Sequence, residues 1–148
     1  MYTFLILVFY ITGKSAPLSE FRVLLLGYRS AGKSSSGNTI LGRQEFDLER
    51  RTAQCVKRQG EVAGRQVTVV EAPGWWSNVN PKDTPELTKQ EIVLSVSHCP
   101  PGPHAVLLVI RVAVAITEDQ RGILQEHLSE SVWSHTMVLF TCGDWLGD

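Results

Sequence analysis

The stretch Gly27-Tyr28-Arg29-Ser30-Ala31-Gly32-Lys33-Ser34 decides how the rest of the chain is interpreted. It follows an apolar run at residues 21–26. A Ser-rich segment comes after it, and this segment is expected to form a helix that ends at Gly42. This order of strand, glycine-bounded loop and helix is typical of phosphate-binding loops. The glycines are needed where a side chain would clash or where the backbone turns through positive φ. The pattern therefore predicts a nucleotide-binding α/β protein.

Each part of this stretch predicts a contact with a polyphosphate. The backbone N–H groups of residues 29–34 are expected to point inward, and the N-terminus of the following helix adds about half a positive charge. Lys33 is expected to bring a full charge to the β- and γ-phosphates in binding and catalysis, and the Ser34 hydroxyl to ligate Mg²⁺. The predicted nucleotide site consists of all eight residues of the stretch and the next one, Ser35.

Length and composition are those of an ordinary globular domain. The chain has 148 residues, enough to bury a core of its own, and a net charge of −1, which gives no argument for a nucleic-acid or anionic-membrane partner. Its three cysteines, Cys55, Cys99 and Cys142, lack paired spacing, and its four histidines lack metal-ligand spacing. These patterns argue against a disulfide framework or a zinc site and favour a reducing compartment, the cytoplasm.

The N-terminal residues 2–12 are almost wholly apolar. The run is shorter than the roughly 20 residues that span a membrane, and it lacks the basic region and cleavage site of a signal peptide. Three interpretations stay open: a weak signal sequence, an extra strand or interfacial anchor, and a leader that precedes the domain. We favour the leader, and expect residues 1–20 to lie outside a domain that covers residues 21–148.

Downstream of the loop, the pattern predicts a β-hairpin and a second helix. Residues 55–62 and 65–71 are expected to be two strands that turn at Ala63-Gly64. Asp83-Thr84-Pro85-Glu86 has the features of a helix start, with a hydroxyl or carboxylate cap and Pro near the first position. The prolines within residues 100–103 are expected to end this helix.

Two further apolar runs, residues 105–112 and 136–141, are expected to be strands covered on both faces. A capping box at residues 117–120 predicts a helix between them. Strands that alternate with helices predict a three-layer α/β fold around a mostly parallel, doubly wound sheet. In such folds, ligands bind at the carboxyl ends of the strands.

The remaining candidate site residues fall where the predicted strands begin or end. The Thr52 hydroxyl, in the loop before the second strand, can complete the Mg²⁺ shell and sense the γ-phosphate. Glu71 ends the third strand, where a carboxylate can hold a Mg²⁺-bound water, and the Gly74 amide can reach the γ-phosphate. Asp144 follows the last strand. A carboxylate there can accept hydrogen bonds from N1–H and the 2-amino group of guanine, which adenine does not offer.

Together these stretches resemble the GTPases of immunity-associated proteins, whose module is called the AIG-type G domain. The resemblance runs from about residue 21 to the end of the chain. It is carried by residues 36–42, by Ala72-Pro73-Gly74-Trp75, by Pro101-Gly102-Pro103-His104-Ala105 and by Thr117-Glu118-Asp119. The phosphate-binding loop alone would indicate only a P-loop NTPase.

The resemblance implies a P-loop G domain and assigns roles to three positions. Thr52 matches the switch threonine, residues 71–74 match the Asp-Thr-Pro-Gly motif, and residues 141–144, with Thr141 and Asp144, match the guanine-reading motif. It further implies GTP and GDP binding with Mg²⁺, slow hydrolysis, and nucleotide-dependent homo- or hetero-dimers across the nucleotide face.

Several positions depart from the family pattern. Glu71 replaces an aspartate, and a misplacement of about 1 Å can cost 10²-fold in catalysis. Gly143 stands where many G domains carry a lysine, and residues 113–116 lack the family's arginine. The sequence stops at Asp148, where a G domain would continue through another strand, a helix and the loop that backs the base. Residues 136–141 are therefore expected to form an edge strand of an incomplete domain.

Hydrolysis is expected to be slow at best. Trp75 follows Gly74 where some G proteins place a water-orienting glutamine, which an indole cannot replace. Arg50 and Arg51 precede Thr52, where some G proteins carry an internal arginine finger, although two solvated loop arginines are the simpler interpretation. Two functions stay open: a GTP-binding switch or self-associating scaffold with slow hydrolysis, and a non-hydrolysing interaction module.

The adjacent tryptophans Trp75 and Trp76 allow two interpretations. They can form a partner-binding surface that opens with nucleotide state, or they can pack onto the edge of the sheet. The sequence does not decide between the two.

Overall fold

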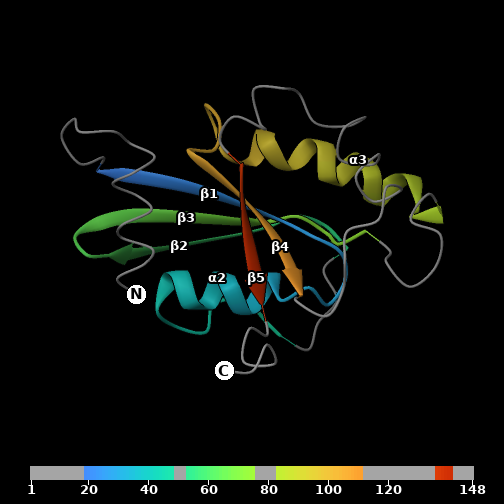
Figure 1. Cartoon of the computed structure of the whole chain (residues 1–148). Coiled ribbons are helices and arrows are strands. Elements are labelled where there is room, and N and C mark those ends of the chain that lie inside the picture. The colour runs from blue at the N-terminus through green and yellow to red at the C-terminus, as the bar shows by residue number, and fades with distance from the viewer. Residues whose placement is uncertain (1–18, 49–52, 76–82, 112–135, 142–148) are drawn as a thin grey trace, which may run out of the picture.

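The computed structural model describes residues 19–48, 53–75, 83–111 and 136–141. These residues form one five-stranded sheet with α2 on one side and α3 on the other, so the predicted three-layer arrangement is confirmed (Figure 1). The elements in chain order are β1 Glu20–Leu26, α2 Lys33–Leu41, β2 Val56–Val62, β3 Arg65–Glu71, α3 Glu86–Leu94, the 3₁₀ helix η2 Ser95–His98, β4 Ala105–Arg111 and β5 Thr136–Thr141.

The strand order is β2-β3-β1-β4-β5, which places β1 at the centre of the sheet. Strands β3, β1, β4 and β5 are parallel, and β2 is antiparallel to β3. The prediction of a mostly parallel sheet is therefore correct. The register pairs Leu25 with Glu71 and Arg111 with Thr141, so the carboxyl ends of the parallel strands meet at one edge.

The predicted hairpin joins β2 and β3. Ala63 and Gly64 form its turn with φ angles of 51° and 75°, as a two-residue turn with a right-handed strand twist requires. The first helix also ends as predicted, because Gly42 adopts φ 71° at its C-terminus. Both boundaries are positions where positive φ favours glycine or a short residue.

The start of α3 differs from the prediction. The helix begins at Glu86, and Pro85 occupies the capping position with φ −54° and ψ 140°. The Pro85 carbonyl accepts the Lys89 N–H at 3.1 Å, but its ring has no oxygen with which to cap an N–H group. Proline therefore lies near the helix start as predicted, but the predicted hydroxyl or carboxylate cap is wrong, because Pro85 occupies the capping position and no side chain caps the helix.

The core lies around the two central strands. Val23, Leu24 and Leu25 of β1 are fully buried, as are Val106 and Val109 of β4. Parallel strands with helices on both faces favour such continuous apolar runs over alternating ones. The near-continuous apolar patterns at these two strands are therefore confirmed as buried strands.

The start of β4 is held against β1 by His104. Its ring stacks on Phe21 with centroids 5.3 Å apart, and its Nδ1 accepts the Arg22 N–H at 2.9 Å. In return, the His104 N–H donates to the Arg22 carbonyl at 2.9 Å, and the Arg22 Nε donates to Gly102. The Pro-Gly-Pro-His motif thus fixes where β4 enters the sheet, at the end remote from the phosphate-binding loop.

In the part of the chain that the structure describes, β5 pairs with β4 alone, as expected for an edge strand. The prediction that residues 136–141 are covered on both faces is wrong, because Val138 is half exposed. No helix within those residues is long and apolar enough to cross a bilayer. The apolar residues 2–12 and the predicted helix after residue 117 lie outside the described residues.

Candidate functional site

The phosphate-binding loop connects the central strand β1 to α2. Its backbone turns through positive φ at Ser30 (65°) and at Gly32 (101°), the residue that precedes the helix. Gly32 offers no capping side chain, and the first turn of α2 carries no acidic residue. The positive end of the helix dipole is therefore left for an external anion.

Two glycines are required by close backbone contacts. A Cβ at Gly27 would lie 2.6 Å from the Val109 carbonyl oxygen, and a Cβ at Gly74 would lie 2.6 Å from the Arg29 backbone nitrogen. Neither backbone can retreat as a flexible side chain would. The loop is thus packed tightly between the end of β4 and the segment that follows β3.

Lys33 is almost completely buried, with 6% of its surface exposed. Its Nζ donates a hydrogen bond to the Tyr28 carbonyl at 3.0 Å, which folds the ammonium back over the loop. Burial lowers the pKa of Lys33 to about 8, and the nearby Glu71 carboxylate opposes this shift. The negative charge of a bound polyphosphate would favour the charged form and raise this pKa again.

Ser34 and Glu71 come together from different elements. The Ser34 hydroxyl, in the first turn of α2, lies 2.8 Å from both carboxylate oxygens of Glu71, the last residue of β3. Burial raises the pKa of Glu71, and the hydrogen bond from Ser34 and the charge of Lys33 lower it. Hydroxyl and carboxylate oxygens are the hard donors that Mg²⁺ prefers, so this pair fits that ion.

The segment after β3 is tied to the loop through Trp75. The Arg29 N–H donates to the Trp75 carbonyl at 2.9 Å, and Tyr28 and Trp75 form an isolated parallel bridge. The Trp75 side chain is 1% exposed. For Trp75 the packing interpretation is therefore confirmed, whereas Trp76 lies outside the described residues.

Thr141 supports the loop from β5. Its hydroxyl donates to the Ala31 carbonyl at 2.7 Å, with the Ile110 carbonyl at 3.3 Å, and its methyl lies 3.1 Å from a Cβ built at Gly32. On the neighbouring strand, the Arg111 N–H donates to the Tyr28 hydroxyl at 2.7 Å. The loop is thus held from β3, β4 and β5.

The structure brings together most of the predicted site residues. The loop residues 27–35 surround the N-terminus of α2, with Glu71, Gly74 and Thr141 in contact with them. The predicted residues Arg50, Arg51, Thr52 and Asp144 lie outside the described residues.

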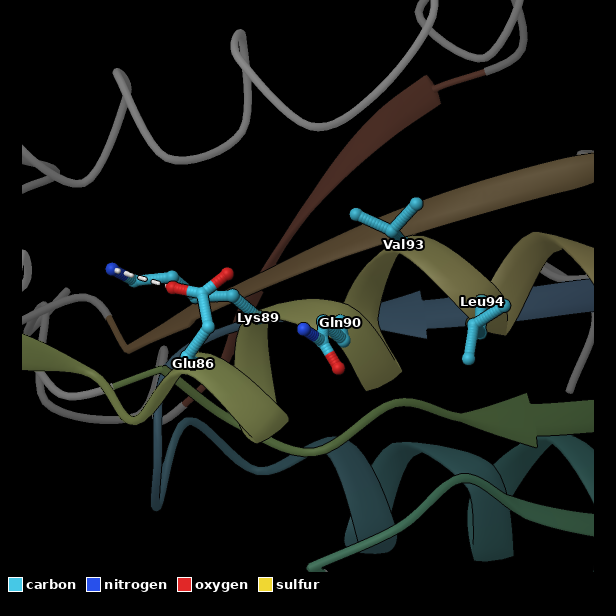
Figure 2. Close-up of a pocket in the computed structure, with 5 residues that line it drawn as sticks. All are labelled: Glu86, Lys89, Gln90, Val93 and Leu94. Atoms are coloured by element: carbon cyan, nitrogen blue, oxygen red, sulfur yellow. Dashed lines mark ion pairs between the residues drawn. The ribbon is translucent and has the colours of Figure 1, made fainter.

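A hollow of about 330 Å³ lies beside α3. Its lining residues come from this one helix (Figure 2): Glu86, Lys89, Gln90, Val93 and Leu94. The Lys89–Glu86 ion pair, at 3.7 Å, is an ordinary surface pair between residues three apart.

Sequence reasoning missed a third group, in which Cys55, Glu91 and His98 meet. Cys55 is far from the other two residues in the chain, and no metal-ligand spacing links it to them. The only available sign is the seven-residue interval between Glu91 and His98, two turns of a helix.

Comparisons with solved structures agree with this geometry. Toc33 from Arabidopsis thaliana in complex with GDP and Mg²⁺ matches with a TM-score of 0.71 at 17% identity, over 94% of this chain and 56% of that one. A structure described as "Dimerization is important for the GTPase activity of chloroplast translocon components atToc33 and psToc159" matches with a TM-score of 0.65 at 20% identity, over 83% of this chain and 50% of that one. These likenesses show the fold of a P-loop G domain.

Sequence comparisons define the relationship. "GTPase IMAP family member 8" from Rattus norvegicus is 32% identical over 141 residues, which is 91% of this chain and 20% of the relative. The chain therefore spans about a fifth of that relative's length. A family model described as "AIG1 family" matches residues 21–148. On this match, the chain belongs to the AIG1 family.

Proposed function

We propose that the chain binds GTP and GDP together with Mg²⁺ in the loop between β1 and α2. The observation that carries this proposal is the convergence of Lys33, Ser34 and Glu71 at the uncapped N-terminus of α2. A cation, a hydroxyl and a carboxylate at the positive end of a helix dipole match a Mg²⁺-polyphosphate. Membership in a family with relatives named as GTPases supports the guanine nucleotide as ligand.

On binding, the contacts seen within the loop change partners. Lys33 releases the Tyr28 carbonyl and donates to β- and γ-phosphate oxygens, while the N–H groups at the start of α2 donate to the phosphates. Ser34 and Thr52 are proposed to hold Mg²⁺ directly and Glu71 to hold it through water. Mg²⁺, when bound with nucleotide, neutralises charge on the phosphate oxygens.

Base selection is proposed to depend on Asp144, with Thr141 beside the loop. A carboxylate accepts from N1–H and the 2-amino group of guanine, and it would stay unpaired beside adenine. Thr141 already touches the Ala31 carbonyl, so the strand that leads to Asp144 reaches the phosphate-binding loop. This contact supports a base site adjacent to the phosphates.

Hydrolysis is proposed to be slow, with Lys33 and Thr52 as catalytic residues and Arg50 or Arg51 as candidates for an internal finger. Trp75 supports this view, because its buried indole occupies the position of a water-orienting glutamine and cannot activate water. The same observation favours the second candidate function, a non-hydrolysing interaction module. The name of the Toc33 structure links dimerization to GTPase activity, and we propose nucleotide-dependent dimers across the nucleotide face here too.

The test is a titration with fluorescent GDP, GTP and ATP analogues, with and without Mg²⁺. We expect guanine analogues to bind more tightly than ATP, and Mg²⁺ to strengthen binding. Lys33→Ala should weaken binding at least about tenfold, because a hydrogen bond to a charged group contributes about 1.5–3 kcal/mol. Lys57→Ala, on the exposed strand β2, is the matched control and should bind as the parent does. A folded parent protein without affinity for guanine nucleotides would contradict the proposal.

A further inference from the structure

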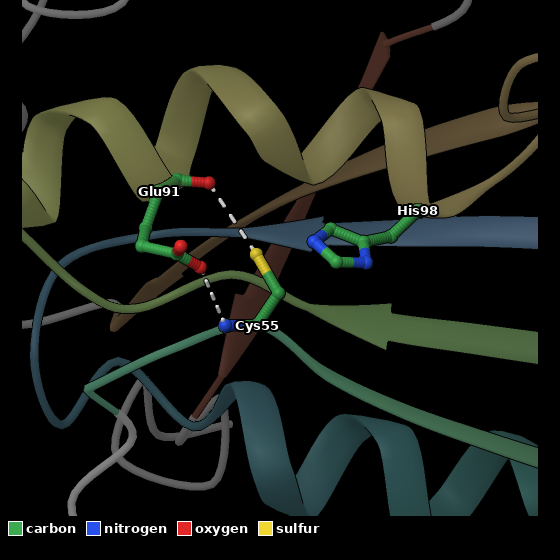
Figure 3. A group of neighbouring side chains, drawn as sticks. All are labelled: Cys55, Glu91 and His98. Atoms are coloured by element: carbon green, nitrogen blue, oxygen red, sulfur yellow. Dashed lines mark hydrogen bonds between the residues drawn. The ribbon is translucent and has the colours of Figure 1, made fainter.

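Three side chains with metal-ligand chemistry meet on the side of the sheet that carries α3. Cys55 directly precedes β2, Glu91 lies in α3, and His98 is the last residue of η2. The Sγ of Cys55, a carboxylate oxygen of Glu91 and a ring nitrogen of His98 all lie within 4.8 Å of one another. Figure 3 shows the His98 ring extending from η2 toward the Cys55 thiol, with the Glu91 carboxylate on the other side.

The fold brings these residues together for identifiable reasons. Glu91 lies in α3 and His98 ends the η2 helix that continues it, and the two helices together bring both side chains beside Cys55. Cys55 is fixed beside them by two hydrogen bonds. Its N–H donates to Glu91 Oε2 at 3.1 Å, and its thiol donates to the Glu91 carbonyl at 3.3 Å.

We propose that Cys55, Glu91 and His98 bind one divalent transition-metal ion, of which Zn²⁺ fits best. A thiolate, an imidazole and a carboxylate are the three ligand types that Zn²⁺ takes in proteins. The soft sulfur and the imidazole disfavour Mg²⁺, which demands oxygen ligands, so this site differs in chemistry from the nucleotide site. On binding, the Cys55 thiol gives its proton to solvent and the thiolate donates its electron pair to the metal.

The three ligand atoms need to move only slightly closer together to bind Zn²⁺. Ligand atoms about 2.0–2.3 Å from a tetrahedral Zn²⁺ lie about 3.3–3.7 Å apart, so the present spacing closes by about 1 Å. His98 is exposed and can turn its ring without disturbing the core, whereas Cys55 and Glu91 are half-buried. Three protein ligands leave the fourth position to water.

The backbone already supplies part of the surrounding support. The Cys55 N–H holds Glu91 Oε2, which orients the carboxylate and leaves Oε1 to reach the metal. Such supporting hydrogen bonds fix the direction of a ligand before the ion arrives. The Glu91 carboxylate is therefore oriented by a main-chain N–H group and not by surface side chains alone.

The location gives the metal a structural role. Cys55 adjoins Val56, which pairs with Glu71 in the sheet, and it follows Thr52 by three residues. A bound ion would tie this segment to α3 and η2 at the same edge of the sheet as the phosphate-binding loop. This structural role, in which the ion links the segment at Cys55 to α3 and η2, goes beyond nucleotide binding and does not depend on it.

The test is a titration of the full, chelator-treated chain with Co²⁺ under reducing conditions. We expect a thiolate-to-cobalt charge-transfer band and the intense visible bands of four-coordinate cobalt, both removed by added Zn²⁺. Cys55→Ser should abolish the charge-transfer band. His98→Ala should weaken binding at least about tenfold, since even losing a residue that only supports a ligand costs roughly 10–100-fold.

Matched controls separate this site from the other thiols and from the nucleotide site. Cys99→Ala removes a neighbouring buried thiol, Ser97→Ala changes an exposed neighbour of His98, and Ser34→Ala alters the proposed Mg²⁺ site. All three should keep the band. No charge-transfer band in the parent protein, or an unchanged titration in His98→Ala, would overturn the proposal. Because His98 is exposed, that variant remains decisive even if Cys55→Ser fails to fold.

Discussion

The Ser34 hydroxyl lies 2.8 Å from each carboxylate oxygen of Glu71, so a hydrogen bond from this hydroxyl links the start of α2 to the end of β3. The Glu71 carboxylate is thus in direct contact with the Ser34 hydroxyl. This contact joins the two elements that are proposed to hold Mg²⁺. A substitution that removes the charge of Glu71 therefore tests whether that charge contributes to Mg²⁺ binding.

Glu71→Gln keeps the size of the side chain and removes its charge. We expect the Mg²⁺ concentration for half-maximal nucleotide binding to rise at least about tenfold, a change of about 1.4 kcal/mol, because Mg²⁺ prefers carboxylate oxygens. Nucleotide affinity without Mg²⁺ should not fall, since a negative charge near the phosphates is lost. Glu61→Gln, on the exposed face of β2, serves as the control. An unchanged Mg²⁺ requirement would remove Glu71 from the metal site.

Lys33→Met should change the stability of the fold and the affinity for nucleotide in opposite directions. The parent buries an ammonium whose pKa falls to about 8, which disfavours the free folded protein at neutral pH. After subtracting the lost hydrogen bond to Tyr28, we expect the variant to gain about 2 kcal/mol in free energy of unfolding. It should also lose nucleotide binding. Urea denaturation at pH 7 measures the gain, and Lys57→Met should change stability by less than about 0.5 kcal/mol.

The same lysine predicts a pH dependence with a definite sign. Between pH 8 and 10.5 the unfolded chain keeps the Lys33 proton and the folded chain releases it, so this residue makes stability rise with pH. The raised pKa values of Cys55 and Cys99, about 12 and 11, act in the opposite direction above pH 9. The difference in unfolding free energy between Lys33→Met and the parent isolates the lysine. It should shrink from pH 8 to 10.5, and a constant difference would show that burial does not shift Lys33.

Gly74→Ala should disturb the phosphate-binding loop through a direct contact with its backbone. The new methyl would lie 2.6 Å from the Arg29 nitrogen and 2.8 Å from its Cα, and these are backbone atoms that cannot swing aside. We expect a loss of about 1–3 kcal/mol in stability and weaker nucleotide binding. In Gly60→Ala the nearest atom is the end of the Arg43 side chain at 3.3 Å, so this control should be tolerated. Equal effects of both substitutions would refute the contact as the cause.

The sequence predicts those features that depend on local backbone chemistry. The loop at residues 27–34, the hairpin turn at Ala63-Gly64 and the helix end at Gly42 are determined by glycine placement and strand periodicity. The contact between Ser34 and Glu71 follows from one added rule, that parallel strands bring their carboxyl ends to one edge.

Other features depend on packing between distant segments, which a linear pattern does not encode. The burial of Trp75 does not follow from the sequence, because both a mobile surface and a packed indole suit the same two tryptophans. The meeting of Cys55 with Glu91 spans 36 residues and arises only when α3 covers the sheet. Spacing rules for metal ligands detect neighbours along the chain, so they argued against a site at these residues.

The parallel bridge between Tyr28 and Trp75 lies beyond the last pair of the β1–β3 ladder, Leu25 with Glu71, and it includes a residue of the loop itself. This bridge and the hydrogen bond from the Arg29 N–H to the Trp75 carbonyl hold the loop backbone in the free protein, which favours a preorganised phosphate site. Nucleotide binding should then cost little backbone entropy. The diphosphate and the triphosphate should contact nearly the same loop conformation. Discrimination between the two would accordingly arise at the rim of the site, from groups that contact the terminal phosphate alone.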